Sequence, residues 1–231
     1  MGAVVSPRIA VVVPVYANEA TLRPLAQRLA AALEDRDWRL RLVIDASPDG
    51  SAAVAAALAA QDHRIAVSGL PVNGGQHAAL AHGLAAEPDA DVWVCLDADL
   101  QDPPEAVPVL LDRLARGDVG AVFAGRRGRY ESAARRLTGG LHRRLAARLT
   151  GLPADAGAFL AMGAAVRDAV VTAVRDEGAP SVVLAVARAG RPVVSVPVER
   201  DQRPEGRSAW TARARLRQSL SSLAWALRAR R

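Results

Sequence analysis

The sequence contains no lysine, so all 30 of its basic residues are arginine. Its single cysteine, Cys95, lies inside an apolar run, which excludes a disulfide framework and a metal site built from cysteines. Aromatic residues make up only 3% of the 231 residues. That fraction is too small for a surface on which nucleic-acid bases stack.

Long apolar runs are missing as well. No stretch has the roughly 20 apolar residues that cross a bilayer as a helix. The run Ile9–Val13 near the N-terminus is too short for a signal peptide. We therefore expect a cytoplasmic protein. The length favours one α/β domain with a C-terminal extension, and we place these at residues 1–206 and 207–231.

The arginines are concentrated in two segments. Residues 126–148 hold eight Arg against one Glu, and residues 200–231 hold nine Arg against two acidic residues, whereas the rest of the chain is net acidic. Such segments suit phosphates, nucleic acid or an anionic membrane. The alternative is that arginine takes the place of lysine on solvated helix faces.

The apolar pattern predicts alternating strands and helices over the first half of the chain. Strands are expected at residues 8–16, 40–44, 64–68, 91–96 and 119–124, and helices at 19–34, 51–60, 76–85 and 103–116. This alternation indicates an α/β fold, with a mostly parallel sheet covered by helices on both faces. Beyond residue 126 we expect a basic helix at 131–149, an irregular segment at 151–163, further helices, a strand at 192–198 and a last Arg-rich helix.

Three aspartates follow predicted strands, namely Asp45, Asp97 and Asp99. Ligands of parallel sheets bind beyond the carboxyl ends of the strands, so these carboxylates should share one crevice. Two carboxylates spaced i and i+2 suit Mg²⁺ or Mn²⁺, which prefer oxygen ligands and complete their shell with water and phosphates. The alternative is an ordinary acidic turn. We expect Asp102 and Glu105 to favour the start of the next helix through its dipole.

The stretch before the 76–85 helix has two interpretations. Asn73–Gly75 either offers backbone N–H groups to a phosphate or forms a tight turn. His77 is either catalytic or packed beside the crevice.

Five segments carry a resemblance: VVVPVYANEATL (11–22), DASPDGS (45–51), NGGQHAALAHGL (73–84), DADLQDPPE (97–105) and GRRGRYES (125–132). In order and spacing they resemble family 2 glycosyltransferases. The most similar branch, that of dolichol-phosphate-mannose-synthase-like enzymes, moves a sugar from a nucleotide onto a polyprenyl phosphate. The resemblance covers about residues 8–210. It implies a GT-A fold with a Rossmann-like sheet, and an inverting, metal-dependent transfer.

The resemblance also assigns residues to roles. It implies that the nucleotide sugar meets Pro14, Tyr16, Glu19, Asp45, Gln76 and Asp97. Mg²⁺ or Mn²⁺ would lie among Asp97, Asp99 and Gln101, with Asp99 also a catalytic residue. Arg126, Arg127 and Arg129 would meet phosphate oxygens of the acceptor or leaving group, for which the guanidinium fork is suited.

The sequence departs from this family at Ala158 and Leu160, where relatives carry an aspartate and an arginine. Asp155 remains as a catalytic substitute, or as a turn residue after Pro153. A hydroxyl acceptor needs a general base, whereas a phosphomonoester is largely ionised at neutral pH without one. The departures therefore favour a lipid phosphate over an alcohol as acceptor.

The last segment, residues 208–231, places Trp210 and several leucines among arginines. A basic amphipathic helix of this kind suits a membrane surface, or it docks on its own domain. We predict a glycosyltransferase that is peripheral on the cytoplasmic face of the membrane, with a separate membrane subunit kept as a further partner. The alternatives are an enzyme with a soluble acceptor and a non-catalytic lipid- or protein-binding homologue. Nucleic acid is not expected as a partner, because no motif accompanies the basic charge.

Overall fold

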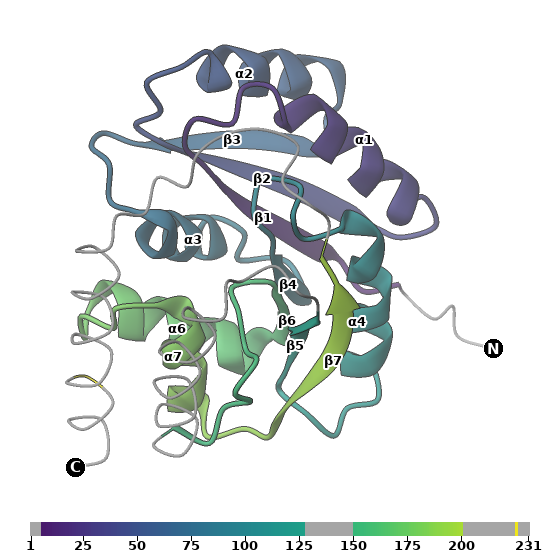
Figure 1. Ribbon diagram of the computed structural model, residues 1–231, viewed down its shortest axis with the longest axis vertical. Helices are drawn as coiled ribbons and strands as arrows, with labels where there is room; N and C mark the ends of the chain where they lie inside the picture. Colours follow the sequence, from purple (N-terminus) through teal and green to yellow (C-terminus); the bar gives the residue numbers. More distant parts are fainter. Residues whose placement is uncertain (1–5, 128–149, 201–224, 226–231) are drawn as a thin grey trace.

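The computed structural model describes residues 6–127, 150–200 and 225 (Figure 1). Within these residues, seven strands form one sheet in the order β3-β2-β1-β4-β6-β5-β7. The strands are β1 Ile9–Val15, β2 Trp38–Asp45, β3 Ile65–Leu70, β4 Val92–Cys95, β5 Ala121–Arg127, β6 Leu160–Gly163 and β7 Val193–Glu199. The predicted α/β class and the predicted strands are thereby confirmed, with boundaries shifted by a few residues.

The helices predicted at 19–34, 51–60, 76–85 and 103–116 are confirmed, with boundaries shifted by a few residues, and further helices follow residue 163. The α-helices are α1 Leu22–Ala32, α2 Ser51–Gln61, α3 Gln76–Ala85, α4 Val107–Leu114, α6 Ala164–Arg175 and α7 Val182–Ala185. Two 3₁₀ turns accompany them, η1 Pro104–Ala106 before α4 and η2 Val186–Ala189 after α7. The prolines of the segment 103–116 lie at the starts of η1 and α4, where a missing N–H is tolerated.

One strand of the sheet was not predicted. The segment 151–163, expected to be irregular, contains β6, which pairs antiparallel with both β4 and β5. The two reversals cancel, so β5 and β7 run in the same direction as β1, β2 and β4. β3 is parallel to β2 as well. The carboxyl ends of six strands, all except β6, therefore lie at one edge of the sheet.

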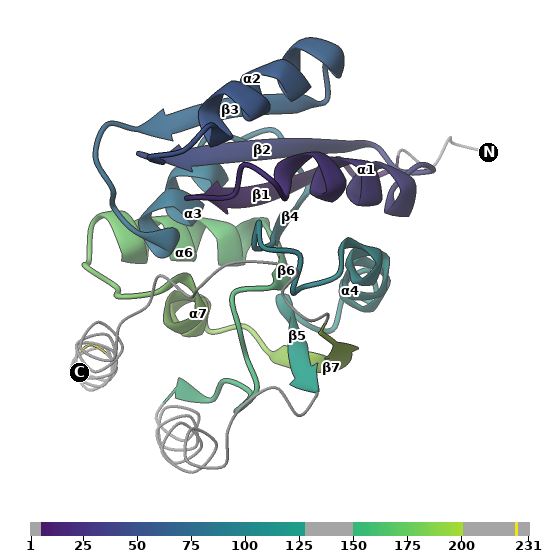
Figure 2. The same cartoon turned by 45° about the horizontal axis from the view of Figure 1, so that its top comes forward.

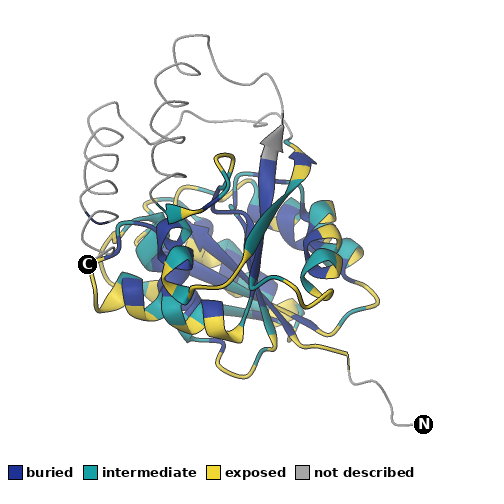
Figure 3. Cartoon of the chain, turned by 90° about the horizontal axis from the view of Figure 1, so that it is seen from below, coloured by how far each residue is buried: buried dark blue, intermediate teal, exposed yellow. Residues whose placement is uncertain are grey.

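The core consists of two apolar layers, one on each face of the sheet (Figures 1 and 2). Successive residues of β1 alternate between them: Val11 and Val13 belong to the layer under α1, α2 and α4, and Val12 to the layer under α3, α6 and α7. Full burial of a valine side chain contributes ~1.5–3 kcal/mol. Both faces of β1 are covered, which explains its unbroken apolar sequence. Figure 3 shows this burial, with the strands dark blue between helices whose outer sides are yellow.

Helix α3 packs unusually close to the sheet at Gly83. A Cβ atom placed on this glycine would lie 2.3 Å from Val12 Cγ1 and 2.8 Å from Val43 Cγ2. Both neighbours are fully buried valines on adjacent strands, so neither has free space into which to move. The absence of a side chain at this position sets the distance between the helix and the strands that lead to the carboxyl edge.

We expect Gly83→Ala to destabilise the protein by about 1–3 kcal/mol, because the added methyl overpacks the contact between α3 and the sheet. Helix propensity by itself favours alanine over glycine by up to about 1 kcal/mol, so the two effects have opposite signs. Urea denaturation of the two proteins decides between them. A variant more stable than the wild type would show that α3 moves outward at little cost.

Candidate active site

The predicted site residues gather at the carboxyl edge of the sheet. Tyr16 follows β1, Asp45 ends β2, and Asp97 and Asp99 follow β4, three strands that are parallel neighbours. Parallel strands present their carboxyl ends at the same edge, so these residues lie at one edge of the sheet, whereas the shared crevice stays a prediction. Tyr16 is 41% exposed there, so its ring is available for contact with a ligand.

Asp45 anchors the loop that leads into α3. Its carboxylate is buried, and its two oxygens accept hydrogen bonds from the backbone N–H groups of Gly74 at 2.7 Å and Gly75 at 2.9 Å. Gly75 has φ +83°, a left-handed conformation that favours glycine. These contacts support the interpretation of Asn73–Gly75 as a tight turn, because the N–H groups of Gly74 and Gly75 already donate to the Asp45 carboxylate. Any contact of Asp45 with a nucleotide base remains a proposal.

The next residue, Gln76, connects this loop to the aspartate pair. Its side-chain amide Nε2 donates a hydrogen bond to Asp97 Oδ1 at 2.5 Å, from the first residue of α3 to the residue two beyond β4. The chain Asp45, loop, Gln76 and Asp97 thus ties the ends of β2 and β4 together. A side chain held by a donor on a helix is oriented before any ligand arrives.

The turn after Asp97 is short and strained. Leu100 has φ +60°, which is uncommon for a residue with a side chain, and its side chain is buried in the core. The residues before and after Leu100 are joined by a hydrogen bond, which the backbone N–H of Gln101 donates to Asp99 Oδ1 at 3.1 Å. The buried leucine therefore fixes the turn from inside, while Asp99 and Gln101 remain partly exposed.

Asp102 does not have the role that the sequence suggested. Instead of interacting with the start of the next helix, its buried carboxylate accepts two hydrogen bonds from Arg200, from Nε at 2.5 Å and from Nη2 at 2.7 Å. Glu105 does lie in the first turn of η1, but it pairs with Arg28 of α1 at 2.7 Å. The helix-dipole prediction missed these two ion pairs, because the partners lie 98 and 77 residues away in the sequence.

Arg200 was missed as a site residue. It directly follows β7 at the carboxyl edge, and only 16% of its side chain is exposed. Burial lowers the pKa of a guanidinium, but here the hydrogen bonds and charge of Asp102, with the charges of Asp97 and Asp99, raise it. The sequence did contain a signal for Arg200, because this residue closely follows the strand predicted at 192–198. The same kind of position identified Asp45.

The loops after β1 and β2 are joined by a polar network. Asp49 accepts hydrogen bonds from the Ser47 hydroxyl at 2.6 Å and from the backbone N–H of Glu19 at 3.1 Å, while the Glu19 carboxylate accepts one from the backbone N–H of Gly50 at 2.9 Å. Burial opposes the ionisation of Asp49, yet these hydrogen bonds and those of Ser51 outweigh it and lower its pKa to about 2. Glu19 therefore has a loop-bridging contact beside its proposed nucleotide contact.

The pKa of Asp49 predicts a pH dependence of stability. In the folded state this pKa is below the ordinary value of 3.8, so its contribution is complete above about pH 4 and is lost as the pH falls through 3.8 toward 2. We expect the difference in unfolding free energy between wild type and Asp49→Asn to be constant above about pH 4 and to shrink below it. Urea denaturation across this range measures the difference. A gap that does not change with pH would exclude an ionised Asp49 as its source.

The residues present fit a divalent cation that is shared with a substrate. Among residues 6–127, 150–200 and 225, no group of three or more His, Cys, Asp or Glu side chains is arranged to hold a metal alone. Mg²⁺ characteristically binds through one or two carboxylates, with substrate phosphates and water as the other ligands. Asp97 and Asp99, with the amide of Gln101, provide such an incomplete oxygen set at the sheet edge.

The positions at which the sequence departs from its resemblance lie in the apolar core. Ala158 is 6% exposed, and Leu160 is fully buried in β6 between Cys95 and Phe123. Asp155, the proposed substitute, accepts a hydrogen bond from the Ser195 hydroxyl of β7 at 3.0 Å. A Cβ atom placed on Gly125 would lie 2.3 Å from Asp155 Oδ2. Asp155 therefore borders β5 at Gly125, the residue that precedes Arg126.

His77 lies at the start of α3, and burial lowers its pKa to about 4. The imidazole is therefore neutral at pH 7, and its buried Nδ1 has no hydrogen-bond partner among the described residues. Packing beside the crevice accounts for this histidine better than proton transfer.

Several predicted site residues and elements lie partly or wholly outside the residues that the structure describes. Arg126 and Arg127 end β5 at the carboxyl edge, but their side chains are not described. Arg129, the expected helix at 131–149 and residues 201–224 lie outside the described residues, so the boundary at 206 stays a prediction. Trp225 is described and is buried in the apolar layer of α3, α6 and α7. Among the described residues, no helix combines the length and the apolar character needed to cross a bilayer.

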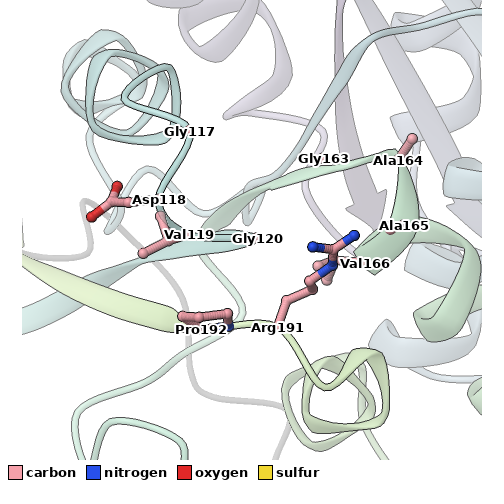
Figure 4. Close-up of a pocket in the computed structure, with 10 residues that line it drawn as sticks. All are labelled: Gly117, Asp118, Val119, Gly120, Gly163, Ala164, Ala165, Val166, Arg191 and Pro192. Carbon is pink, nitrogen blue, oxygen red and sulfur yellow. The ribbon is translucent and has the colours of Figure 1, made fainter.

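A pocket of about 210 Å³ lies elsewhere, at the opposite edge of the sheet (Figure 4). Gly120 before β5, Gly163 at the end of β6 and Arg191 before β7 line it. Its one carboxylate, that of Asp118, pairs with Arg113 at 2.6 Å. This pocket contains none of the predicted site residues.

This chain is similar to proteins of a known family. The family described as Glycosyl transferase family 2 matches residues 10–162. Among curated proteins, the undecaprenyl-phosphate 4-deoxy-4-formamido-L-arabinose transferase of Sodalis glossinidius (strain morsitans) is 39% identical over 148 residues, 62% of this chain and 44% of that protein. The protein of that description from Pseudomonas aeruginosa (strain LESB58) is 42% identical over 123 residues, 51% of this chain and 36% of that protein. The chain thus matches less than half the length of these relatives.

Solved structures show the same fold. Glucosyl-3-phosphoglycerate synthase from Mycobacterium tuberculosis, in complex with Mn²⁺, uridine diphosphate and phosphoglyceric acid, superposes with a TM-score of 0.69 at 21% identity, covering 96% of this chain and 78% of that one. Mannosyl-3-phosphoglycerate synthase from Rubrobacter xylanophilus gives 0.65 at 17% identity, covering 96% and 73%. At such identities the likeness establishes the fold, which is the predicted GT-A arrangement.

Proposed function

Because this chain belongs to glycosyl transferase family 2, we propose that it transfers a sugar from a nucleotide-diphosphate sugar to a polyprenyl phosphate. The observation that carries the proposal is the arrangement at the carboxyl edge, where Asp97 and Asp99 follow β4 and Gln76 holds Asp97. The two curated relatives are undecaprenyl-phosphate sugar transferases by name, which supports the choice of acceptor.

The donor diphosphate would be bound through Mg²⁺ or Mn²⁺ on Asp97, Asp99 and Gln101. When bound, such a cation neutralises the charge that develops on a nucleoside diphosphate leaving group. The solved structures with Mn²⁺ or Mg²⁺ and uridine diphosphate support divalent metal use in this fold. Tyr16 at the exposed end of β1 and Asp45 at the end of β2 would bind the nucleoside, with Pro14 and Glu19 beside them.

The acceptor would reach the site from the side of β5. Arg126 and Arg127 end this strand, and with Arg129 they would bind the phosphate of the lipid. Ala158 and Leu160 are buried apolar residues and so provide neither a base nor a cation. A phosphate acceptor needs no base because it is already ionised at neutral pH. Asp155, beside Gly125, would orient the arginines or the acceptor rather than remove a proton.

The partners and location follow from the acceptor. A polyprenyl phosphate is held in a membrane, so the chain would work peripherally at the cytoplasmic face, where nucleotide sugars are made available. Apart from Arg200, which is buried in its pair with Asp102, the arginines of the segments 126–148 and 200–231 would contact anionic headgroups. A separate membrane subunit would present the lipid.

One assay tests the proposal. Purified protein is given a panel of nucleotide sugars with and without undecaprenyl phosphate in detergent, first with Mg²⁺ or Mn²⁺ and then with EDTA. Release of nucleoside diphosphate that requires both lipid and metal is the expected result. Transfer only to water-soluble acceptors would overturn the lipid proposal. If no donor is turned over and none binds, the chain is a binding module rather than an enzyme.

A further inference from the structure

The ion pair between Asp102 and Arg200 joins two parts of the site that are far apart in the sequence. Asp102 ends the turn that carries Asp99, and Arg200 directly follows β7. In the sheet, β6 and β5 lie between β4 and β7. The pair therefore connects the aspartate turn with the far side of the sheet, over two intervening strands.

The geometry of the pair restrains direction as well as distance. Nε and Nη2 of Arg200 donate to the two separate oxygens of Asp102. Such a two-point contact between planar groups fixes their relative orientation, which a lysine cannot reproduce. Only 5% of the Asp102 side chain and 16% of the Arg200 side chain are exposed, so water does not readily replace either partner.

The restraint reaches Asp99 through a short and rigid path. Two features restrain the backbone between Asp99 and Asp102. Leu100 has a left-handed conformation with a buried side chain, and the backbone N–H of Gln101 donates a hydrogen bond to Asp99 Oδ1. On the other side, Gln76 holds Asp97. The two aspartates are thus held from opposite sides, one from α3 and one from β7.

We propose that Arg200 is a positioning residue for the divalent cation, which holds the turn 99–102 so that Asp97 and Asp99 converge on one ion. This inference rests on the proposed function, because it assumes that the aspartate pair binds a metal. Arg200 acts through Asp102 and does not itself ligate the cation. Its charge also faces Asp97 and Asp99, so removing the charge would by itself favour a cation. Geometry and charge therefore predict opposite changes in metal affinity.

Arg200→Lys separates the two effects, because it keeps the charge and loses the two-point contact. We expect this variant to bind Mn²⁺ about tenfold or more weakly, the usual size of effect when a group that orients a metal ligand is replaced. The measurement is a titration of Mn²⁺ followed by electron paramagnetic resonance, which detects free ion, in the presence of uridine or guanosine diphosphate. It requires no turnover.

Arg41→Lys is the matched control. Arg41 pairs with Glu87 at 2.6 Å, with side chains 16% and 10% exposed, so its burial resembles that of Arg200. The Arg41–Glu87 pair joins β2 to the residues after α3, and the ion-pair partner of Arg41 is Glu87 rather than Asp97 or Asp99. We expect Arg41→Lys to lower the melting temperature to a similar extent and to leave the Mn²⁺ affinity unchanged.

Each result decides between the alternatives. If Arg200→Lys binds Mn²⁺ as the wild type does, or weakens it no more than Arg41→Lys, the positioning role is wrong while the proposed function stands. If Arg200→Lys fails to fold, Asp102→Asn replaces it, with the same expected direction and the same criterion for rejection. If the wild type itself binds no Mn²⁺ with either nucleotide, the metal-dependent function is wrong and the inference falls with it.

Discussion

Asp99→Ala is expected to reduce metal-dependent sugar transfer by at least about a hundredfold while the protein remains folded. Replacing groups that merely orient metal ligands already costs about 10- to 100-fold, and Asp99 is proposed as a ligand itself. Its carboxylate is partly exposed and accepts a hydrogen bond from a neighbouring amide, so its loss removes little of the core. Nucleoside diphosphate release and lipid-linked product, measured together, report the loss.

Asp112→Ala is the control for Asp99→Ala. Asp112 is a carboxylate of α4 whose side chain is 66% exposed in an ion pair with Arg36. Exposed pairs of this kind contribute ~0–1 kcal/mol, so this variant should retain wild-type activity and stability. If Asp99→Ala kept more than about a tenth of the activity under the same conditions, Asp99 would not be a metal ligand.

Asp102→Ala is expected to destabilise the protein by about 3–5 kcal/mol, the second large effect. The substitution leaves the charge of Arg200 buried without its carboxylate, and removal of one partner of a buried ion pair has this usual cost. Urea denaturation measures the effect as a lower midpoint with an unchanged slope. A slope that changes would instead indicate an altered unfolded or native state.

The double variant Asp102→Leu with Arg200→Met tests whether the loss of stability comes from the unpaired charge of Arg200. Replacing both members of a buried pair by apolar residues is often neutral or stabilising, so we expect it to recover most of the stability lost in Asp102→Ala. Asp118→Ala, which removes a carboxylate that is 61% exposed from its pair with Arg113, should unfold like the wild type. A single variant indistinguishable from Asp118→Ala would show that the buried charge of Arg200 is accommodated by water.

Local patterns were sufficient for most of the fold. The β-branched run of β1 is buried on both faces, and that burial is what its unbroken apolar sequence predicts. The strand β6 could not be predicted this way. It is four residues long, Leu-Ala-Met-Gly, with no β-branched residue, and it is a strand only because β4 and β5 provide hydrogen-bond partners on both sides.

For the site too, some features follow from local sequence patterns and others only from the tertiary structure. The sequence by itself determined that Asp45, Asp97 and Asp99 lie at one edge of the sheet, because the carboxyl ends of parallel strands necessarily share one edge. It did not determine which side chains hold them. The partner of Asp102 is Arg200, and that of Asp45 is the backbone of Gly74 and Gly75, contacts between residues 98, 29 and 30 positions apart. Strand periodicity is a short-range property of the chain, whereas an ion pair that bridges two intervening strands exists only once the strand order is set.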